Sequence, residues 1–333
     1  MSTAPGTVDP GVVWRVINGF TGYWIVVAAI RLGLFDALAP GPMTAVELAA
    51  TRSGDVDRTT VLADALVAIG LLEIGGGAYR LTATAAELLV ADGPRSMNDL
   101  VLWSPGPHEN WPALDRTVIG EPPPFPIDHD PAPFYAHLVR ATRPTQLAVA
   151  RAVLPQLDLP TGAAMLELGA GGAPWSTALF ESDPSATATV NDLPGVIEES
   201  RRALEPFSDR STFVEGDYLE VSLDTARFDV VVLAHVLRAE PVERARLLVR
   251  RAAAALKPGG RVVIAEYLGG RDPKTFAQPA MLAVTMMAAT MAGRLCTADS
   301  IAGWLDDASC KEIARLDPVM NTDLIVAAPA PLT

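Results

Sequence analysis

Polar residues gather at the end of an apolar run, where residues 228–241 read FDVVVLAHVLRAEP. Apolar residues fill positions 230–234 and are followed by His235, Arg238 and Glu240. In an open α/β sheet, ligands bind beyond the carboxyl ends of buried strands. The stretch therefore predicts a catalytic strand end, at which Arg238 carries a permanent positive charge.

A second candidate strand end carries a glycine-rich turn, in MLELGAGGAPW at 165–175. Glycines let a ligand approach the backbone closely, and the helix that follows offers free N–H groups. A dinucleotide-binding turn needs a third glycine where this chain has Pro174, which lacks an N–H. The turn instead resembles the acidic-x-Gly-x-Gly-x-small pattern of class I S-adenosylmethionine (SAM) methyltransferases, in Glu167, Gly169, Gly171 and Ala173. A purely structural turn is the alternative.

Acidic residues also follow the next two apolar runs. TATVNDLPG (187–195) contains Asp192, about 20 residues beyond the turn, where a carboxylate can accept hydrogen bonds from both ribose hydroxyls. FVEGDYLE (213–220) places Asp217 and Tyr218 where they suit an adenine amino group and ring face. Each residue alone could be an ordinary loop residue, but their order along the chain predicts an adenosyl site.

The second half of the chain alternates apolar runs with helical patterns. We expect strands near 164–168, 187–191, 211–214, 228–234, 261–267, 312–317 and 323–328, and helices near 174–181, 195–205 and 242–256. This alternation predicts an α/β fold with a Rossmann-like, doubly wound sheet.

The first half reads as helices with one hairpin. TAVE (44–47) and TAAE (84–87) have the capping-box pattern that starts a helix, and a glycine turn at 75–77 separates two short strands. This order predicts a winged-helix shape, and the apolar segment 12–38 predicts a dimerisation surface. We expect a dimerisation domain at 1–95, a helical and Pro-rich connector and lid at 96–160, interrupted at Pro144, and a catalytic SAM-binding domain at 161–333.

The composition and net charge of the chain limit the kinds of binding partner that can be expected. The chain has 333 residues, 50% of them hydrophobic, and a net charge of −13, which argues against nucleic acid and anionic membranes as partners. The most apolar stretch, 281–293, is too short to span a bilayer, and the N-terminus lacks a signal-peptide pattern, so a cytoplasmic location is expected. Cys296 and Cys310 have no disulfide or metal-ligand spacing, and we expect buried thiols and no metal.

The chain resembles the bacterial and plant-type small-molecule O-methyltransferases through motifs spread along it: TAVELAA, LVAIGLLE, YRLTATAAELL, LELGAGG, NDLPGVI, VEGDYLE and LKPGGRVVIAEYL. The resemblance implies a SAM-dependent homodimer that acts in natural-product or antibiotic biosynthesis. It also implies cofactor contacts at the methionine end from Glu167, Gly169 and Gly171, at the ribose from Asp192 and Leu193, and at the adenine from Asp217 and Tyr218.

The resemblance fails at the stretch 228–241, which contains Arg238. Family members usually read Leu-His-Asp-Trp after the fourth strand, with the histidine as general base, whereas this chain has Arg238 at the histidine position. Glu266 matches the carboxylate that orients the family's base. A second orienting carboxylate would fall in AGRLCT (292–297), where the chain offers Leu295. We expect an Arg238–Glu266 ion pair in place of the His–Glu pair.

Three interpretations follow from the missing histidine. The acceptor could be a carbon, an amine or an enolate that needs no base at position 238, with Arg238 anchoring an anionic group. Another histidine could be the base, with His235, His108 and His129 as candidates. Alternatively, the fold binds SAM without transferring its methyl group, as a cyclase, hydroxylase or decarboxylase. We expect methyl transfer, and C- or N-methylation no less than O-methylation.

The acceptor is expected against aromatic and methionine side chains. Trp103, His108 and Trp111 precede the Pro-rich connector and could form one wall. The segment MLAVTMMAATM carries Met281, Met286, Met287 and Met291 in the region where the family resemblance implies an acceptor site. Methionine adapts to apolar ligands, although a plain core helix would carry the same stripe. From these groups we select Trp103, His108, Trp111, Met281 and Met287 as acceptor contacts.

Overall fold

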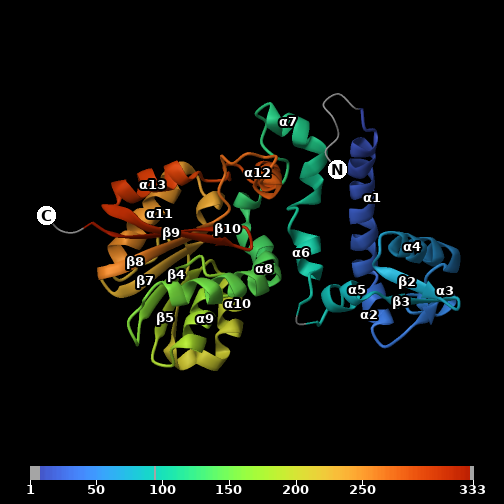
Figure 1. Ribbon diagram of the computed structural model, residues 1–333, viewed down its shortest axis with the longest axis horizontal. Helices are drawn as coiled ribbons and strands as arrows, with labels where there is room; N and C mark the ends of the chain where they lie inside the picture. The colour runs from blue at the N-terminus through green and yellow to red at the C-terminus, as the bar shows by residue number, and fades with distance from the viewer. Residues whose placement is uncertain (1–7, 94, 331–333) are drawn as a thin grey trace. The chain divides into compact units, whose positions relative to one another are not determined.

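The alternating pattern folds as a seven-stranded sheet in a computed structural model that describes residues 8–93 and 95–330 (Figure 1). The strand order is β6-β5-β4-β7-β8-β10-β9. The strands are β4 (Ala164–Leu168), β5 (Thr187–Asp192), β6 (Ser211–Glu215), β7 (Phe228–Ala234), β8 (Leu256–Glu266), β9 (Cys310–Val319) and β10 (Thr322–Pro329). Strands β4 to β8 pair in parallel, and β10 pairs antiparallel with both β8 and β9. This arrangement confirms the predicted fold class.

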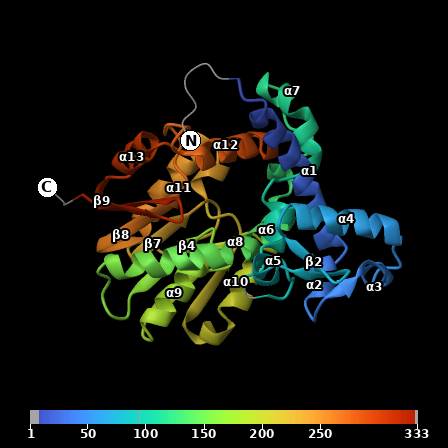
Figure 2. The ribbon, with the colours of Figure 1, turned by 45° about the vertical axis from the view of Figure 1, so that its right-hand side comes forward.

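Helices cover both faces of this sheet (Figure 1, Figure 2). One face packs against α8 (Pro131–Val153), α9 (Pro174–Ser182) and α10 (Ile197–Ala203). The other packs against α11 (Val242–Ala255) and α13 (Ala298–Asp307). Both cysteines are buried thiols, as expected. The remaining helices of this half are α7 (Leu114–Val118) and α12 (Ala277–Ala289).

The strand order reverses beside β4, which has β5 on one side and β7 on the other. Leu168 of β4 is level with Asn191 of β5 and with Leu233 of β7, so the three strands end at the same edge. A crevice outside such a switch point is the usual ligand site of an open α/β sheet. The fold therefore brings the glycine turn, Asp192 and His235 to one edge.

The chain divides into two units, residues 1–102 and 103–333. The division expected at 1–95, 96–160 and 161–333 stays a prediction, although most of the expected connector belongs to the second unit. The first unit contains α1 (Gly11–Arg31), α2 (Leu34–Leu38), β1 (Met43–Thr44), α3 (Ala45–Ala50), α4 (Val56–Ala68), β2 (Leu72–Gly75), β3 (Ala78–Leu81), α5 (Ala83–Leu88) and most of α6 (Asn98–Trp103).

The first unit has the expected hairpin and one of the two expected capping boxes. β2 and β3 pair antiparallel across Gly76 and Gly77, which both have positive φ. Thr44 and Glu47 form the capping box that starts α3. The box expected at 84–87 is wrong, because α5 begins two residues earlier: the Thr82 side chain accepts a hydrogen bond from the Ala85 N–H. Thr82 also bonds back to Leu71, which ties the helix start to the hairpin.

Helix α1 leaves much of its apolar surface exposed. Only Val27 and Ala29 are buried, whereas Val12, Val13, Trp14, Val16, Ile17, Phe20 and Trp24 are exposed. By length and composition alone, α1 is apolar enough to cross a membrane. The expectation from the sequence considered only the stretch 281–293 as a possible span and did not consider this helix.

Helix α8 runs through Pro144, so the expected interruption there is also wrong. A proline inside a helix costs about 3 kcal/mol because it removes one backbone donor and crowds the preceding turn. Burial of Val149, Ala150 and Val153 in the core beside α9 offsets that cost. The continuous helix can therefore bring its N-terminal half to the edge of the sheet.

Candidate active site

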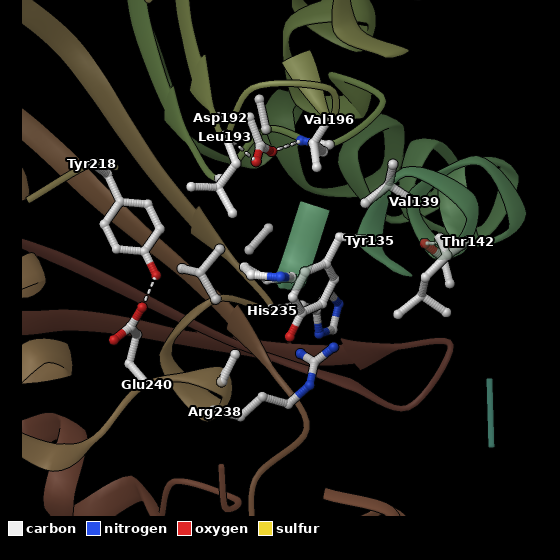
Figure 3. Close-up of a pocket in the computed structure, with 18 of the residues that line it drawn as sticks. Tyr135, Val139, Thr142, Asp192, Leu193, Val196, Tyr218, His235, Arg238 and Glu240 are labelled. Carbon is white, nitrogen blue, oxygen red and sulfur yellow. Dashed lines mark hydrogen bonds between the residues drawn. The ribbon is translucent and has the colours of Figure 1, made fainter. Parts of the chain in front are cut away.

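A cavity of about 500 Å³ lies beyond the carboxyl ends of the parallel strands. Its walls come from the glycine turn after β4, the ends of β5, β6, β7 and β8, and one face of α8. Figure 3 shows Asp192 and Tyr218 on one side, and Tyr135, His235 and Arg238 on another. The predicted cofactor end and the predicted catalytic strand end therefore share one cavity.

The glycine turn is tightly covered. Gly169 and Gly171 have φ values of +63° and +56°, in the left-handed region that favours glycine. A Cβ at Gly169 would overlap Val236, and one at Gly171 would lie 2.9 Å from Val139 of α8. Ala173, where the family resemblance implies a third glycine, also has a positive φ of +46°, which costs roughly 1 kcal/mol for a residue with a Cβ.

Glu167 turns its carboxylate toward the start of α9. Its oxygens accept hydrogen bonds from the Trp175 N–H (3.2 Å), the Ser176 N–H (2.8 Å) and the Ser176 hydroxyl (2.6 Å). The residue is only 2% exposed, and burial raises its pKa to about 7 against the opposing effect of these bonds. Glu167 thus stabilises the positive end of α9, and the expected contact of its carboxylate with a methionine group stays a prediction.

Asp192 braces the turn from the end of β5. Its Oδ2 accepts from the Gly171 N–H at 2.6 Å and its Oδ1 from the Leu193 N–H at 2.7 Å (Figure 3). The side chain lines the cavity, and burial raises its pKa to about 6. Each carboxylate oxygen has a second lone pair, so both remain able to accept a ligand hydroxyl.

The end of β6 is held by a network that includes a residue the sequence analysis missed. Arg244 of α11 donates to Asp217 at 2.6 Å and also to Glu240. Glu240 accepts the Tyr218 hydroxyl as well. Burial and the Glu240 charge raise the Tyr218 pKa well above its usual value, so the phenol stays neutral. The spacing of Glu240 and Arg244, four residues apart, was the available sequence signal.

At the end of β7, His235 is buried without a hydrogen-bond partner for its ring. Its backbone has a left-handed φ of +60° and its N–H donates to Ala265 O. The side chain is 9% exposed, and neither ring nitrogen has a partner among the described residues. Nδ1 lies 3.7 Å from a Glu266 oxygen, beyond hydrogen-bond range. Burial and then the Arg238 charge lower the His235 pKa, which favours the neutral imidazole.

Arg238 and Glu266 form the expected ion pair. The guanidinium donates to a Glu266 carboxylate oxygen at 2.9 Å, and the Arg238 backbone N–H donates to the other oxygen at 3.3 Å. Burial alone would raise the Glu266 pKa, but Arg238 and His235 hold it below its usual value. The pair fixes one edge of the guanidinium. Its other N–H groups have no hydrogen-bond partner among the residues that the structure describes.

Comparison with protein families settles the class of this chain. Residues 115–309 match a model described as an O-methyltransferase domain, and residues 14–91 match one described as an O-methyltransferase dimerisation domain. The chain belongs to the O-methyltransferase family. It is a SAM-dependent methyltransferase, as the resemblance in its motifs implied.

The matches to individual relatives cover most of the methyltransferase. It is similar to 3-hydroxy-5-methyl-1-naphthoate 3-O-methyltransferase of Streptomyces sahachiroi, with 28% identity, and the match covers 93% of this chain and 92% of the relative. It is 28% identical to the N,N-dimethyltransferase OxyT of Streptomyces rimosus, over 74% of this chain and 75% of that one. The fold matches human N-acetylserotonin methyltransferase in complex with SAM, with a TM-score of 0.82, 24% identity and coverage of 98% and 100%.

The cavity of the methyltransferase fits SAM at its cofactor end. Gly169 and Gly171, both with a left-handed backbone, let a ligand approach the turn without meeting a Cβ. Asp192 offers acceptor lone pairs, and the Tyr218 ring forms part of the cavity wall. Arg143 of α8 adds a cation beside the turn, where its Nε donates to Gly172 O at 2.8 Å. Acceptor oxygens for a diol, an aromatic ring for a base and a cation for a carboxylate are the groups that SAM requires.

The expected acceptor contacts lie elsewhere. None of Trp103, His108, Trp111, Met281 and Met287 lines the cavity, so their contact with an acceptor stays a prediction. Trp103 stacks on His137 with ring centroids 4.3 Å apart, and Trp111 donates to Pro105 O. His108 begins a short 3₁₀ helix at 108–113. Met281 is 67% exposed and Met287 is half-buried, both in α12.

Two residues near the expected ones do line the cavity. Met291 lies just beyond the end of α12, and its N–H donates to Asp128, which is next to the candidate base His129. The methionine stripe therefore reaches the site only with its last member, because the chain turns into the cavity after the helix ends.

Tyr135 of α8 is a site residue that sequence reasoning missed. It lines the cavity, and Figure 3 shows its hydroxyl directed toward His235 and Arg238. Burial raises its pKa to about 12. Nothing in the helical pattern around it distinguished it from a core tyrosine.

Proposed function

We propose that this methyltransferase acts on a small-molecule acceptor that carries an anionic group, and that Arg238 binds that group. The observation that carries the proposal is a guanidinium held by Glu266 at 2.9 Å and still facing the cavity with unused donors. The family resemblance implies a base at this position. An arginine stays protonated and cannot accept the acceptor's proton. It can hold a carboxylate or an enolate oxygen through charge-assisted hydrogen bonds.

This role for Arg238 leaves the methylated atom open to carbon, nitrogen or oxygen. A stabilised enolate or an amine attacks a sulfonium methyl group without first losing a proton to the protein, and correct positioning then supplies much of the acceleration. Relatives that the chain resembles include an O-methyltransferase of a naphthoate and an N,N-dimethyltransferase. The first of these names contains an aromatic carboxylate, which supports an acid as the acceptor class.

We also propose His235 as the group that receives a proton when the acceptor must lose one. Bound SAM supplies the electrophilic methyl group. The lowered pKa of His235 keeps a ring nitrogen free to accept a proton, and Glu266 at 3.7 Å can stabilise the imidazolium that results. Glu266 would thus orient Arg238 and His235 together.

The remaining contacts follow from the geometry of the cavity and the family match. Asp192 with Leu193 would hold the ribose, Asp217 with Tyr218 the adenine, and Gly169 with Gly171 the methionine end, while Glu167 supports the turn from behind. The exposed apolar face of α1, together with the dimerisation-domain match, supports a homodimer. We propose a cytoplasmic enzyme of natural-product biosynthesis.

Three matched acceptors test the anion requirement. Purified enzyme with SAM would be given 3-hydroxy-1-naphthoate, its methyl ester and 2-naphthol, and S-adenosylhomocysteine and the product masses would be measured. We expect a product one methylene heavier from the naphthoate and at least tenfold slower turnover of the two neutral compounds. Equal turnover of 2-naphthol, or unconsumed SAM with all three, would contradict the proposal.

Replacing His235 tests its proposed role as the group that accepts the acceptor's proton. His235→Asn keeps a side chain that tolerates the left-handed backbone, and it should lower kcat by roughly 10²–10⁴-fold, the usual contribution of a general base. His129→Asn is the control, because His129 does not line the cavity. A large loss in His129→Asn with full activity in His235→Asn would move the base to His129.

A further inference from the structure

Three polar groups without full hydrogen bonding converge at one end of the cavity. Both ring nitrogens of His235 are buried without a hydrogen-bond partner among the described residues. The Tyr135 hydroxyl lines the cavity and makes no hydrogen bond to another described residue. The Arg238 guanidinium, bonded to Glu266 through one of its nitrogens, completes the group. Figure 3 shows the Tyr135 hydroxyl directed toward the other two side chains.

The buried His235 ring is the unusual member of this group. A buried donor or acceptor without a partner costs about 1–3 kcal/mol, and native structures hold few of them. Elsewhere in the same cavity most polar side chains are bonded, among them Asp192 to two backbone amides and Tyr218 to Glu240. The exception is Gln146, whose Oε1 has no partner among the described residues. The missing partners at the Tyr135 end therefore indicate a place for the polar part of a ligand.

We propose that Tyr135 and Arg238 together clamp one oxyanion of the acceptor, so that Tyr135 selects acids over their neutral analogues. This inference rests on the proposed role of Arg238 and adds the second donor. Because the Tyr135 pKa is about 12, the phenol keeps its proton at physiological pH and can donate it in a hydrogen bond. A carboxylate offers two oxygens, which suits two donors from different elements.

Helix α8 holds Tyr135 rigidly in this position. Tyr135, Val139 and Arg143 are spaced four residues apart and so lie on one face of the helix. Val139 packs over Gly171, and Arg143 bonds to Gly172 O and to the Thr177 hydroxyl. The same helix face therefore covers the cofactor turn and presents the tyrosine to the acceptor.

The rest of this end of the cavity is mostly apolar or aromatic, with one acidic residue, Asp128, which accepts a hydrogen bond from the Met291 N–H. Its lining includes Pro131, Leu138, Tyr267, Met291 and Ala292. A ligand with one oxyanion on an apolar ring would satisfy both the polar group and these walls. The structure thus points to an aromatic acid as the acceptor class.

Calorimetry with a matched ligand pair tests the clamp. Full-length protein saturated with S-adenosylhomocysteine would be titrated with 1-naphthoate and with its neutral analogue 1-naphthamide. We expect wild type to prefer the naphthoate. Tyr135→Phe should weaken naphthoate binding by roughly tenfold, the effect of one hydrogen bond to a charge, and should change naphthamide binding much less. Loss of the hydroxyl leaves no other described residue without a hydrogen-bond partner, so the variant should fold and bind S-adenosylhomocysteine as wild type does.

Two further variants separate the clamp from the role of Arg238. Tyr79→Phe removes a buried hydroxyl, bonded to Asp64 in the first unit, and should leave both ligands unaffected. Arg238→Met combined with Glu266→Gln removes the ion pair as a whole and should abolish the preference for naphthoate.

The outcomes are distinguishable. If Tyr135→Phe binds naphthoate as tightly as wild type while the double variant loses it, the clamp is overturned and the Arg238 proposal stands. If the double variant keeps the preference, or if wild type shows none, both proposals are overturned.

Discussion

The two ends of the cavity differ in where their polar groups find hydrogen-bond partners. At the cofactor end, Glu167 and Asp192 are bonded to backbone N–H groups of the turn and of α9. At the acceptor end, the His235 ring nitrogens have no hydrogen-bond partner among the described residues, and the Tyr135 hydroxyl makes no hydrogen bond to any of them. The cofactor end is therefore organised before any ligand arrives, whereas we propose that the acceptor end is completed by its ligand.

The difference also separates what the fold requires from what a substrate requires. Asp192 holds the Gly171 N–H, so its removal disturbs the turn as well as the cofactor. The hydroxyl of Tyr135 makes no hydrogen bond to any other described residue, so its removal should affect only acceptor binding. Substitutions at the two ends should accordingly have effects of different kinds.

The largest effect is expected at Asp192. Asp192→Asn removes the charge that would accept two ribose hydroxyls, and two charge-assisted hydrogen bonds are together worth roughly 10²–10³-fold in affinity. Calorimetric titration with S-adenosylhomocysteine measures the loss. Glu198→Gln, on the exposed side of α10, is the control and should bind normally. A loss below threefold in Asp192→Asn would remove this residue from the cofactor site.

The next effect concerns stability at the acceptor end. Arg238→Met leaves the buried Glu266 charge unpaired and should lower the free energy of unfolding by about 3–5 kcal/mol. Adding Glu266→Gln removes that charge and should restore most of the loss. Urea unfolding of the three proteins measures it. If Arg238→Met is as stable as wild type, the Arg238 guanidinium is not what stabilises the buried Glu266 carboxylate.

A smaller effect should appear in the pH dependence of cofactor binding. The pKa of Asp192 is raised to about 6, and ribose binding needs the ionised form. Affinity for S-adenosylhomocysteine should therefore be constant above pH 7 and weaken by up to about tenfold per pH unit below 6. Titrations between pH 5 and 8 measure this, and Asp192→Asn should show a flatter profile. A wild-type profile that is flat down to pH 5 would contradict the assignment.

The two ends should also contribute to stability with opposite dependence on pH. The folded pKa of Asp192 lies above its unfolded value, so its ionisation costs stability, and that cost grows as the pH rises from about 4 to about 6. The folded pKa of His235 lies below its unfolded value. Above the unfolded pKa, His235 is neutral in both states and costs no stability. Below it, the protein loses stability as the pH falls, because the unfolded chain binds the proton more readily.

The sequence predicted the positions of the glycine turn, Asp192 and the strands well because their signals are local. The glycine turn, Asp192 and the seven strands each follow from a short pattern that is readable without the rest of the fold. Arg238 and Glu266 were paired correctly because both follow neighbouring parallel strands, whose ends meet at one edge.

The residues that line the other end of the cavity were not found from the sequence, because long-range packing decides them. Tyr135 reaches the cavity only because α8 continues through Pro144 and lies over the glycine turn. Met291, rather than Met281 or Met287, lines the cavity because the chain leaves the helix axis after α12. Neither fact is encoded in the residues next to them.

A crystal structure with S-adenosylhomocysteine and 1-naphthoate tests the central claim most directly. We predict the carboxylate within hydrogen-bond distance of both the Arg238 guanidinium and the Tyr135 hydroxyl, with the naphthalene ring against Tyr267 and Met291. A carboxylate bound elsewhere in the cavity, with Arg238 bonded only to Glu266, would contradict the account.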